Sequence, residues 1–392
     1  MFANLSSLII TYVELKDISS LKEPSYINQL KNIENKVFSP MNIYMITSLL
    51  LNGAKEGSTE KELMSLLNIP DKISLNGYIA KLIYLNGIKN IELHLGTAVY
   101  VQMSVELTAD FSSICINRFN CSISKVDFKN NAYVAENINA WIQKTTNYKM
   151  LDRIISPVNI DKDTKIMLVN IVYVNSRWLN LTYKKGTEEY KFFVSPSKMY
   201  SVPTMKFEKL TLIHGEIPHW NAKFIEIPFS DNNITMIIFL PNEKMEPWNL
   251  KYLEKKINFT EFKSIRTAHT NKLQKATYLY LPKFTSEYTQ NITDFFRQKG
   301  VNTMFEDNAD FTHLSKIPLK VNNIVQTVSV NIKEGNSEVP KIVRSRVRKP
   351  PRVRPPQKLI IDRPFCYLIE VYGELMFVGT VRAPDFISIY ER

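Results

Sequence analysis

Residues 166–174 read Ile-Met-Leu-Val-Asn-Ile-Val-Tyr-Val, an apolar run that one polar amide, Asn170, interrupts. A strand with one face in water would alternate apolar and polar side chains, whereas this run is apolar at both parities. We therefore predict a strand that is buried on both faces and lies in the middle of a sheet. The run is far shorter than the ~20 apolar residues that a membrane-spanning helix needs.

Upstream of this strand, two helices are predicted from their starting residues. Ser39 is a suitable N-cap, Pro40 suits the first helical position, and Gly53 stands where the helix should have just ended. Residues 59–62, Thr-Glu-Lys-Glu, have the spacing of a capping box and predict a second, shorter helix through Leu67.

Further elements follow from hydrophobic periodicity. We predict helices over 132–144 and 291–298, a hairpin over 224–229 and 234–241, a half-buried strand ending at 332, and strands over 276–284, 366–373 and 374–381. Because the order has no regular βα alternation, the fold class is α+β. No linker-like stretch divides residues 20–330, so we expect a single domain over 21–392, after an N-terminal segment over 1–20.

Cysteine usage and the N-terminus bear on location. Cys115, Cys121 and Cys366 are odd in number and lack CxxC spacing, which favours buried free thiols over a zinc site or a structural bridge. Residues 1–20 are partly apolar but have no leading basic residue, so they form at best a degenerate secretion signal. Acceptor sequons for glycosylation stand at Asn4, Asn120, Asn180, Asn233, Asn258 and Asn291. An extracellular, glycosylated protein is the expectation, and a cytoplasmic one the alternative.

The positive charge is concentrated in one segment. The chain has a net charge of +12, and residues 339–358 contain eight basic residues and no acid, which leaves +4 for the rest. The same segment holds five prolines. A basic face spread over the whole fold is therefore excluded, and we interpret this segment as a displayed loop.

Catalytic motifs are missing from the sequence. No GxGxxG, GxxxxGK[ST], GxSxG or HExxH pattern occurs, and the five histidines are scattered without metal-ligand spacing. We therefore expect neither an enzyme nor a bound cofactor or metal.

Nine short motifs occur in an order that identifies a family. They are Phe38-Ser39-Pro40, residues 53–59, residues 137–141, residues 168–178, residues 202–205, residues 281–284, residues 309–311, residues 362–365 and residues 377–379. With these motifs the chain resembles a serpin from about Tyr26 to Pro384. The resemblance implies three β-sheets, about nine helices and an exposed reactive loop near the C-terminus, at about 334–358.

The resemblance also implies a mechanism. In serpins a protease attacks the loop as a substrate, and the cleaved loop inserts as a new central strand of the largest sheet, so that stored strain distorts the protease. Ser39 and Asn170 match two members of the polar cluster beneath the sheet that opens. Gln326 stands where the family usually has a histidine, and because an amide does not titrate, the cluster should not respond to pH. Trp178 matches the tryptophan at the point where insertion begins.

The hinge before the loop departs from the family pattern. Its residues are Glu334, Gly335, Asn336, Ser337, Pro340 and Lys341. Asn336 replaces the usual glycine, and Pro340 would remove one ladder hydrogen bond from an inserted strand. Counted from Ser337, strand alternation would point Lys341 inward, where an unpaired ammonium costs several kcal/mol. Full insertion is therefore doubtful.

Two functions are compatible with this loop. The first is a regulator of proteases, of the serine-type endopeptidase inhibitor family, with a basic bait loop for trypsin-like or furin-like enzymes. Counting back from the motif at 362–365 favours the bond Arg352-Val353, with Arg348-Lys349 as the second candidate. Bonds followed by proline are poor candidates, because proline is rigid and lacks an N–H.

The second function is that of a non-inhibitory serpin whose polycationic loop binds an acidic partner, such as a glycosaminoglycan, an anionic protein or a nucleic acid. A solvated loop without a partner is the remaining alternative. In each case we expect a monomer with no membrane span.

Overall fold

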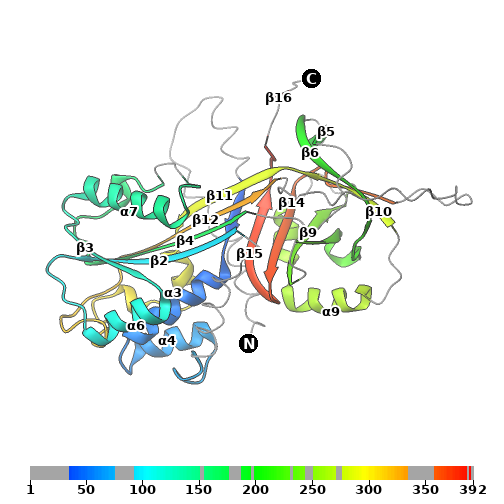
Figure 1. Cartoon of the computed structure of the whole chain (residues 1–392). Coiled ribbons are helices and arrows are strands. Elements are labelled where there is room, and N and C mark those ends of the chain that lie inside the picture. The colour runs from blue at the N-terminus through cyan, green and yellow to red at the C-terminus, as the bar shows by residue number, and fades with distance from the viewer. Residues whose placement is uncertain are drawn as a thin grey trace, which may run out of the picture.

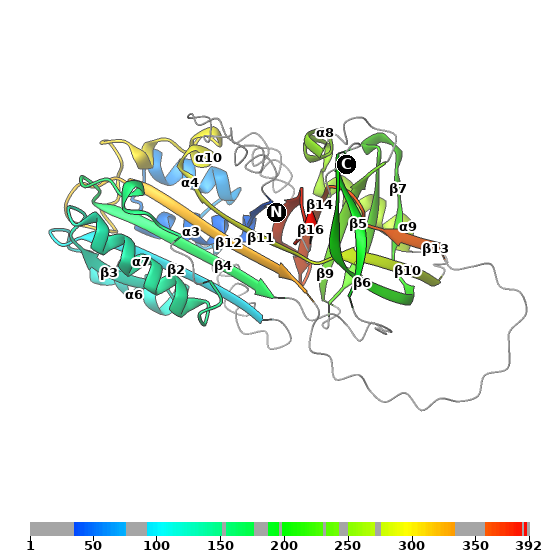
Figure 2. The ribbon, with the colours of Figure 1, turned by 90° about the horizontal axis from the view of Figure 1, so that it is seen from above.

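The structure is a computed structural model that describes residues 35–75, 92–150, 154–175, 187–195, 198–229, 233–242, 250–270, 276–333, 357–385 and 388–389. The strands in these ranges form three sheets, which Figures 1 and 2 show from two directions. One sheet contains the apolar run with which the sequence analysis began.

This first sheet has five strands. Their order is β11 (Phe284–Asn291), β12 (Asn323–Ile332), β4 (Ile166–Asn175), β2 (Glu92–Gln102) and β3 (Ser122–Val126). Strand β4 lies at the centre and is buried from Ile166 to Val174, which confirms the sequence prediction. The prediction of a half-buried β12 was wrong: Ser329 is only 2% exposed, because β12 is also an inner strand covered on both faces.

The other two sheets lie beside the first, at the end of the folded molecule away from α6 and α7 (Figure 2). The six-stranded sheet has the order β1 (Lys36–Phe38), β15 (Glu374–Val381), β14 (Phe365–Val371), β9 (Ile234–Pro241), β8 (Ala222–Pro228) and β7 (His214–Ile217). The third sheet contains β13 (Gln357–Ile360), β10 (Ala276–Pro282), β6 (Lys198–Thr211), β16 (Ser388–Ile389) and β5 (Glu188–Ser195). The predicted hairpin is the antiparallel pair β8–β9, and the two C-terminal strands are β14 and β15.

The described ranges hold seven α-helices, and the other helices that we expected fall outside this test. These are α3 (Pro40–Gly53), α4 (Ser58–Leu67), α6 (Ala109–Phe119), α7 (Asn131–Thr145), α8 (Leu250–Lys256), α9 (Phe259–Thr270) and α10 (Thr293–Gln298). Short 3₁₀ turns lie at η2 (Pro157–Asn159), η3 (Pro218–Trp220) and η4 (Thr303–Phe305). In Figure 1, α7 covers one face of the five-stranded sheet and α3 lies on the other.

Two details of the predicted helix ends were wrong. Gly53 is the last residue of α3 rather than the residue beyond it. A Cβ at Gly53 would lie 2.9 Å from the Cβ of Leu314, so close packing explains this glycine. The capping box of α4 does not form: the Thr59 hydroxyl accepts from the N–H of Asp310, and Glu62 accepts from distant backbone donors.

Between residues 282 and 298, the bounds of the strands and of the helix differ from those that we predicted. The predicted strand over 276–284 is split into β10 and β11, and β11 extends to Asn291, so α10 begins only at Thr293. Polar residues dominate β11, which hid its strand character from a hydrophobicity pattern.

Cys115, Cys121 and Cys366 are free and buried, as predicted. Among the described helices, none is long and apolar enough to cross a membrane.

Candidate functional site

The site begins at the boundary between β12 and β4, which we call the seam. The two strands pair in parallel from Asn323 opposite Met167 to Asn331 opposite Asn175. Gln326 lies directly opposite Asn170, and both side chains are fully buried. Parallel pairing is slightly weaker per residue than antiparallel pairing, and within this sheet it occurs at the seam and between β2 and β3.

Gln326 holds the start of α3 against β12. Its Oε1 accepts from the backbone N–H of Ser39 at 3.2 Å, and its Nε2 donates to the backbone C=O of Ser39 at 3.1 Å. The side-chain amide therefore bonds both backbone polar groups of one buried residue, as a neighbouring strand would. The Ser39 hydroxyl donates to the carbonyl of Met376 at 2.9 Å and accepts from the N–H of Asn42, which gives α3 its N-cap.

Asn42 fastens the same helix to the other strand of the seam. Its Nδ2 donates to Oδ1 of Asn170 on β4. The Nδ2 of Asn170 in turn donates to the hydroxyl of Thr97 on β2 at 2.9 Å. The first turn of α3 is thus bonded to β12 through Gln326 and to β4 through Asn42, and the polar cluster spans the seam.

Helix α7 covers the opposite face of the five-stranded sheet, where it packs mainly on β2 (Figure 1). One apolar cluster joins Ile138 and Ile142 of α7 with Ile171 of β4 and Val325 of β12. The buried Asn139 holds the chain that follows α7, because its side-chain amide exchanges hydrogen bonds of 2.8 and 2.9 Å with the backbone of Ile155. Separation of β12 from β4 would therefore disturb contacts on both faces of the sheet.

The structure brings together three of the predicted site residues, namely Ser39, Asn170 and Gln326. Their role in loop insertion stays a prediction. The remaining predicted residues lie outside the described residues: Trp178, Glu334, Gly335, Asn336, Ser337, Pro340, Lys341, Arg348, Lys349, Arg352 and Val353.

Sequence reasoning missed Asn42 and Thr97. Asn42 is the one amide in the apolar first turn of α3, three residues after the N-cap, and this position was a usable signal. Thr97 gave no comparable signal, because a threonine in a strand is ordinary.

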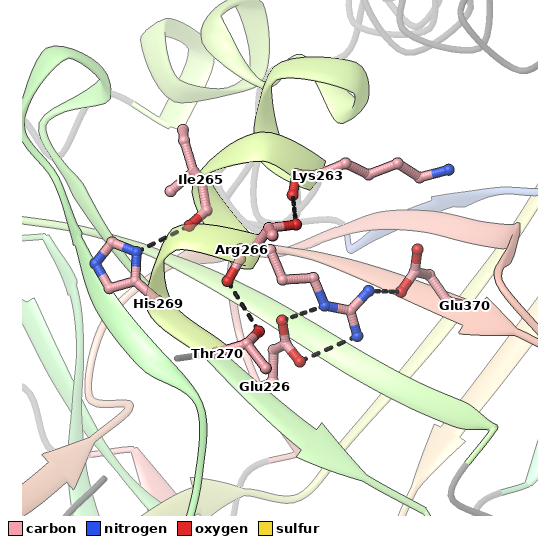
Figure 3. A network of polar contacts seen from close by, with 8 residues as sticks. Glu226, Lys263, Ile265, Arg266, His269, Thr270 and Glu370 are labelled. Carbon is pink, nitrogen blue, oxygen red and sulfur yellow. Dashed lines mark hydrogen bonds and ion pairs between the residues drawn. The ribbon is translucent and has the colours of Figure 1, made fainter. Parts of the chain in front are cut away.

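A second polar cluster lies away from the seam, where α9 meets the six-stranded sheet (Figure 3). The Arg266 guanidinium bonds Glu226 of β8 in a bidentate way, with Nε–Oε1 at 2.6 Å and Nη2–Oε2 at 3.1 Å. Its Nη1 lies 2.5 Å from Oε2 of Glu370 on β14. Burial raises the pKa of Glu226, and the positive charge of Arg266 opposes that rise. The cluster fastens α9 to two strands.

Comparison with known proteins decides the family. A model of the serpin family, described as serine protease inhibitor, matches residues 25–384. The chain belongs to the serpin family. Serpins are protease inhibitors rather than enzymes, in agreement with the missing catalytic motifs.

Named relatives of this serpin include inhibitors from insects. Antitrypsin of Bombyx mori is 29% identical over 330 residues, which are 83% of this chain and 82% of the relative. Serine protease inhibitor 42Dd of Drosophila melanogaster is 29% identical over 378 residues, 94% of this chain and 95% of the relative. A solved structure of native protease nexin-1 with heparin has a TM-score of 0.78 at 24% identity and covers 97% of this chain and 98% of its own. That likeness confirms the serpin fold with its three sheets.

Proposed function

We propose that this serpin presents the segment between β12 and β13, residues 334–356, as a basic bait loop to proteases that cleave after arginine or lysine, with trypsin-like and furin-like enzymes as the target class. The expected loop end at 358 is two residues too late, because Gln357 and Lys358 pair with β10 as the start of β13. The observation that carries the proposal is the concentration of eight basic residues, without an acid, in residues 339–358. The flanks of this segment support it: β12 ends at Ile332 in the five-stranded sheet, and β13 begins at Gln357 in another sheet. A connection between two sheets is free to be displayed to a partner.

The favoured bond is Arg352-Val353, and Arg348-Lys349 is the second candidate. A trypsin-like specificity pocket takes an arginine side chain, and valine after the bond keeps the backbone N–H that proline would lack. Arginines at 344, 346 and 348 also suit the acidic cleft of a convertase.

A denaturing gel tests this proposal. The serpin is incubated with trypsin and, separately, with furin, and a band that resists denaturation at the summed mass is expected. Arg352→Glu should remove the complex with trypsin, and Arg348→Glu is its matched control at the second bond. Cleavage of the loop without any covalent band in either mixture would contradict inhibition.

The hinge sequence limits how far the cleaved loop can insert. Three hinge residues oppose insertion as a buried central strand. Asn336 lacks the backbone freedom of the usual glycine, Pro340 has no N–H to donate to the sheet, and Lys341 would bury an unpaired charge. We therefore expect insertion to be only partial, enough to retain the covalent bond to the protease but with little rise in thermal midpoint when the native loop is cut. The triple variant Asn336→Gly, Pro340→Ala, Lys341→Ala should gain clearly after cleavage, and a large gain for the unmodified chain would show that the hinge argument is wrong.

A polyanion ligand is the second candidate function. The eight cations of residues 339–358 favour it, and protease nexin-1 was solved with heparin. Retention on immobilised heparin should then fall steeply with salt, because exposed charges are screened within about 8–10 Å at physiological ionic strength. Neutralising the basic residues at 344, 346, 348 and 349 should abolish most of the retention, and unchanged retention would place the binding elsewhere.

We also propose that this serpin acts outside the cell. The sequon residues Asn120, Asn233 and Asn291 are exposed, which leaves them accessible to glycosylation. Expression through a secretory pathway followed by glycosidase treatment should lower the apparent mass. An unchanged mass would argue against glycosylation at these sites.

A further inference from the structure

A cavity of about 430 Å³ lies between two of the sheets, away from the seam. One wall consists of β7 and β8 of the six-stranded sheet, and the opposite wall consists of β13 with the residues that follow it. His269, near the end of α9, contributes to the lining. The volume falls within the range of about 300–1,000 Å³ that small-molecule sites occupy.

The arrangement of His269 makes this cavity a defined feature rather than a loose gap. Its Nδ1 lies 2.9 Å from the carbonyl oxygen of Ile265, to which it must donate, and Figure 3 shows the ring held in this way. Its ring meets that of Phe224 edge to face at 5.2 Å. A Cβ on Gly215 would lie 2.4 Å from the His269 ring, so a glycine is needed beneath it.

Part of the charge in the lining is already neutralised. The Nη1 of Arg363 lies 2.6 Å from Oδ1 of Asp362, and its Nε donates to the carbonyl of Pro241 at 2.8 Å. Lys223 lies 3.7 Å from Glu216, and both side chains are well exposed, so this pair contributes little.

The remaining charge is positive. Lys358 on β13 is exposed and makes no ion pair within the described ranges of the chain. Burial lowers the pKa of His214, and the neighbouring His269 lowers it further, because both disfavour the imidazolium. An anion between these groups would pair with Lys358 and would favour the protonated, hydrogen-bond-donating form of His214 that burial otherwise disfavours.

The rest of the lining is apolar. Phe224, Ile225 and Leu240 contribute from the six-stranded sheet, and Leu359 contributes from β13. All four are buried side chains. An occupant that satisfies both parts of the lining must combine a negative group with a flat apolar body.

We propose that this cavity binds a small amphipathic anion, namely a carboxylate or sulfonate carried on an aromatic or similarly flat apolar body. The anionic group lies towards Lys358 and His214, and the apolar body lies along Phe224 and Leu240. This site does not depend on whether the loop inhibits a protease.

Occupancy of the cavity would act on β13. This strand pairs with β10 over four residues, Gln357 to Ile360, and is an edge strand of its sheet. A ligand between the two walls adds contacts from β13 to β7 and β8. Because the complete cavity exists only while β13 is in place, the ligand stabilises the attachment of the strand that follows the basic segment.

Two matched fluorescent probes test the proposal on the full chain. The anion is 8-anilinonaphthalene-1-sulfonate, and N-phenyl-1-naphthylamine has the same rings without the sulfonate. We expect one site for the anion and about tenfold weaker binding of the uncharged probe, the factor that one charge-assisted contact supplies. Lys358→Glu should weaken anion binding to a similar extent, and His214→Trp should fill the cavity and abolish it. Lys61→Glu is the control, on exposed α4 at the far end of the molecule (Figure 2).

Hydrogen exchange tests the effect on β13. Bound anion should slow amide exchange in residues 358–361 relative to the probe-free protein. Equal affinity for the two probes, or anion binding unchanged in both Lys358→Glu and His214→Trp, would overturn the site. Binding at the site without slower exchange in β13 would overturn its coupling to the strand.

Discussion

Replacing Gln326 with alanine would test whether the polar cluster holds the seam together. The substitution removes both hydrogen bonds to Ser39. It leaves the Ser39 N–H buried without a partner, whereas the Ser39 C=O, as that of the N-cap, keeps the first hydrogen bond of α3. A buried polar group that loses its partner costs about 1–3 kcal/mol, so the Ser39 N–H predicts a loss of about 1–3 kcal/mol. At an unfolding entropy of about 2.1 cal/mol/K per residue, the chain of 392 residues should unfold about 1–4 °C lower.

Urea denaturation of the intact protein is the assay, with two further variants. Gln326→Met keeps most of the volume, so it should retain most of the loss if the hydrogen bonds rather than a cavity are responsible. Gln290→Ala is the matched control, because Gln290 pairs with Gln326 on the neighbouring strand β11 and its Nε2 makes no hydrogen bond in the described structure. The loss at Gln326 should be the same at about pH 5 and about pH 8, since an amide does not titrate.

The reasoning fails if Gln326→Ala stays within about 0.5 kcal/mol of the parent, the range of an ordinary surface substitution. It also fails if Gln290→Ala costs as much, because the effect would then belong to any glutamine in this part of the sheet. A loss confined to Gln326→Ala and absent from Gln326→Met would assign it to the cavity.

Limited trypsin should cut first between residues 344 and 354 and leave the rest of the chain whole; early cuts elsewhere on a gel would remove the loop assignment. Arg266→Met should destabilise the protein by about 3–5 kcal/mol, because it leaves Glu226 and Glu370 buried without their cation. Burial already raises the pKa of Glu226, and without Arg266 it would exceed the value in the unfolded chain further, so urea denaturation should show stability falling as pH rises above the ordinary glutamate range; a flat profile would contradict this. Burial raises the pKa of the Cys366 thiol well above its usual value, so iodoacetamide should label it only after unfolding, and rapid labelling of the folded chain by mass spectrometry would refute this.

The sequence was sufficient where one local pattern had one structural solution. The run at 166–174 is apolar at both parities, and only an inner strand covers both faces, so the central position of β4 followed directly. Ser39 followed by proline defined the start of α3, because the N-cap geometry involves residues three apart in the chain. The ordered motifs then identified the serpin fold.

Tertiary structure decided which polar groups meet. Gln326 is hydrogen-bonded to Ser39, which lies 287 positions away in the sequence. Asn42 is hydrogen-bonded to Asn170, which lies 128 positions away. No local spacing distinguishes such a pair from the other amides of the chain. The capping-box prediction at 59–62 failed for the same reason, since Thr59 and Glu62 bond backbone donors more than 200 residues away. Backbone geometry fixes contacts between near neighbours, whereas a buried donor takes whichever acceptor the packing of the whole chain brings to it.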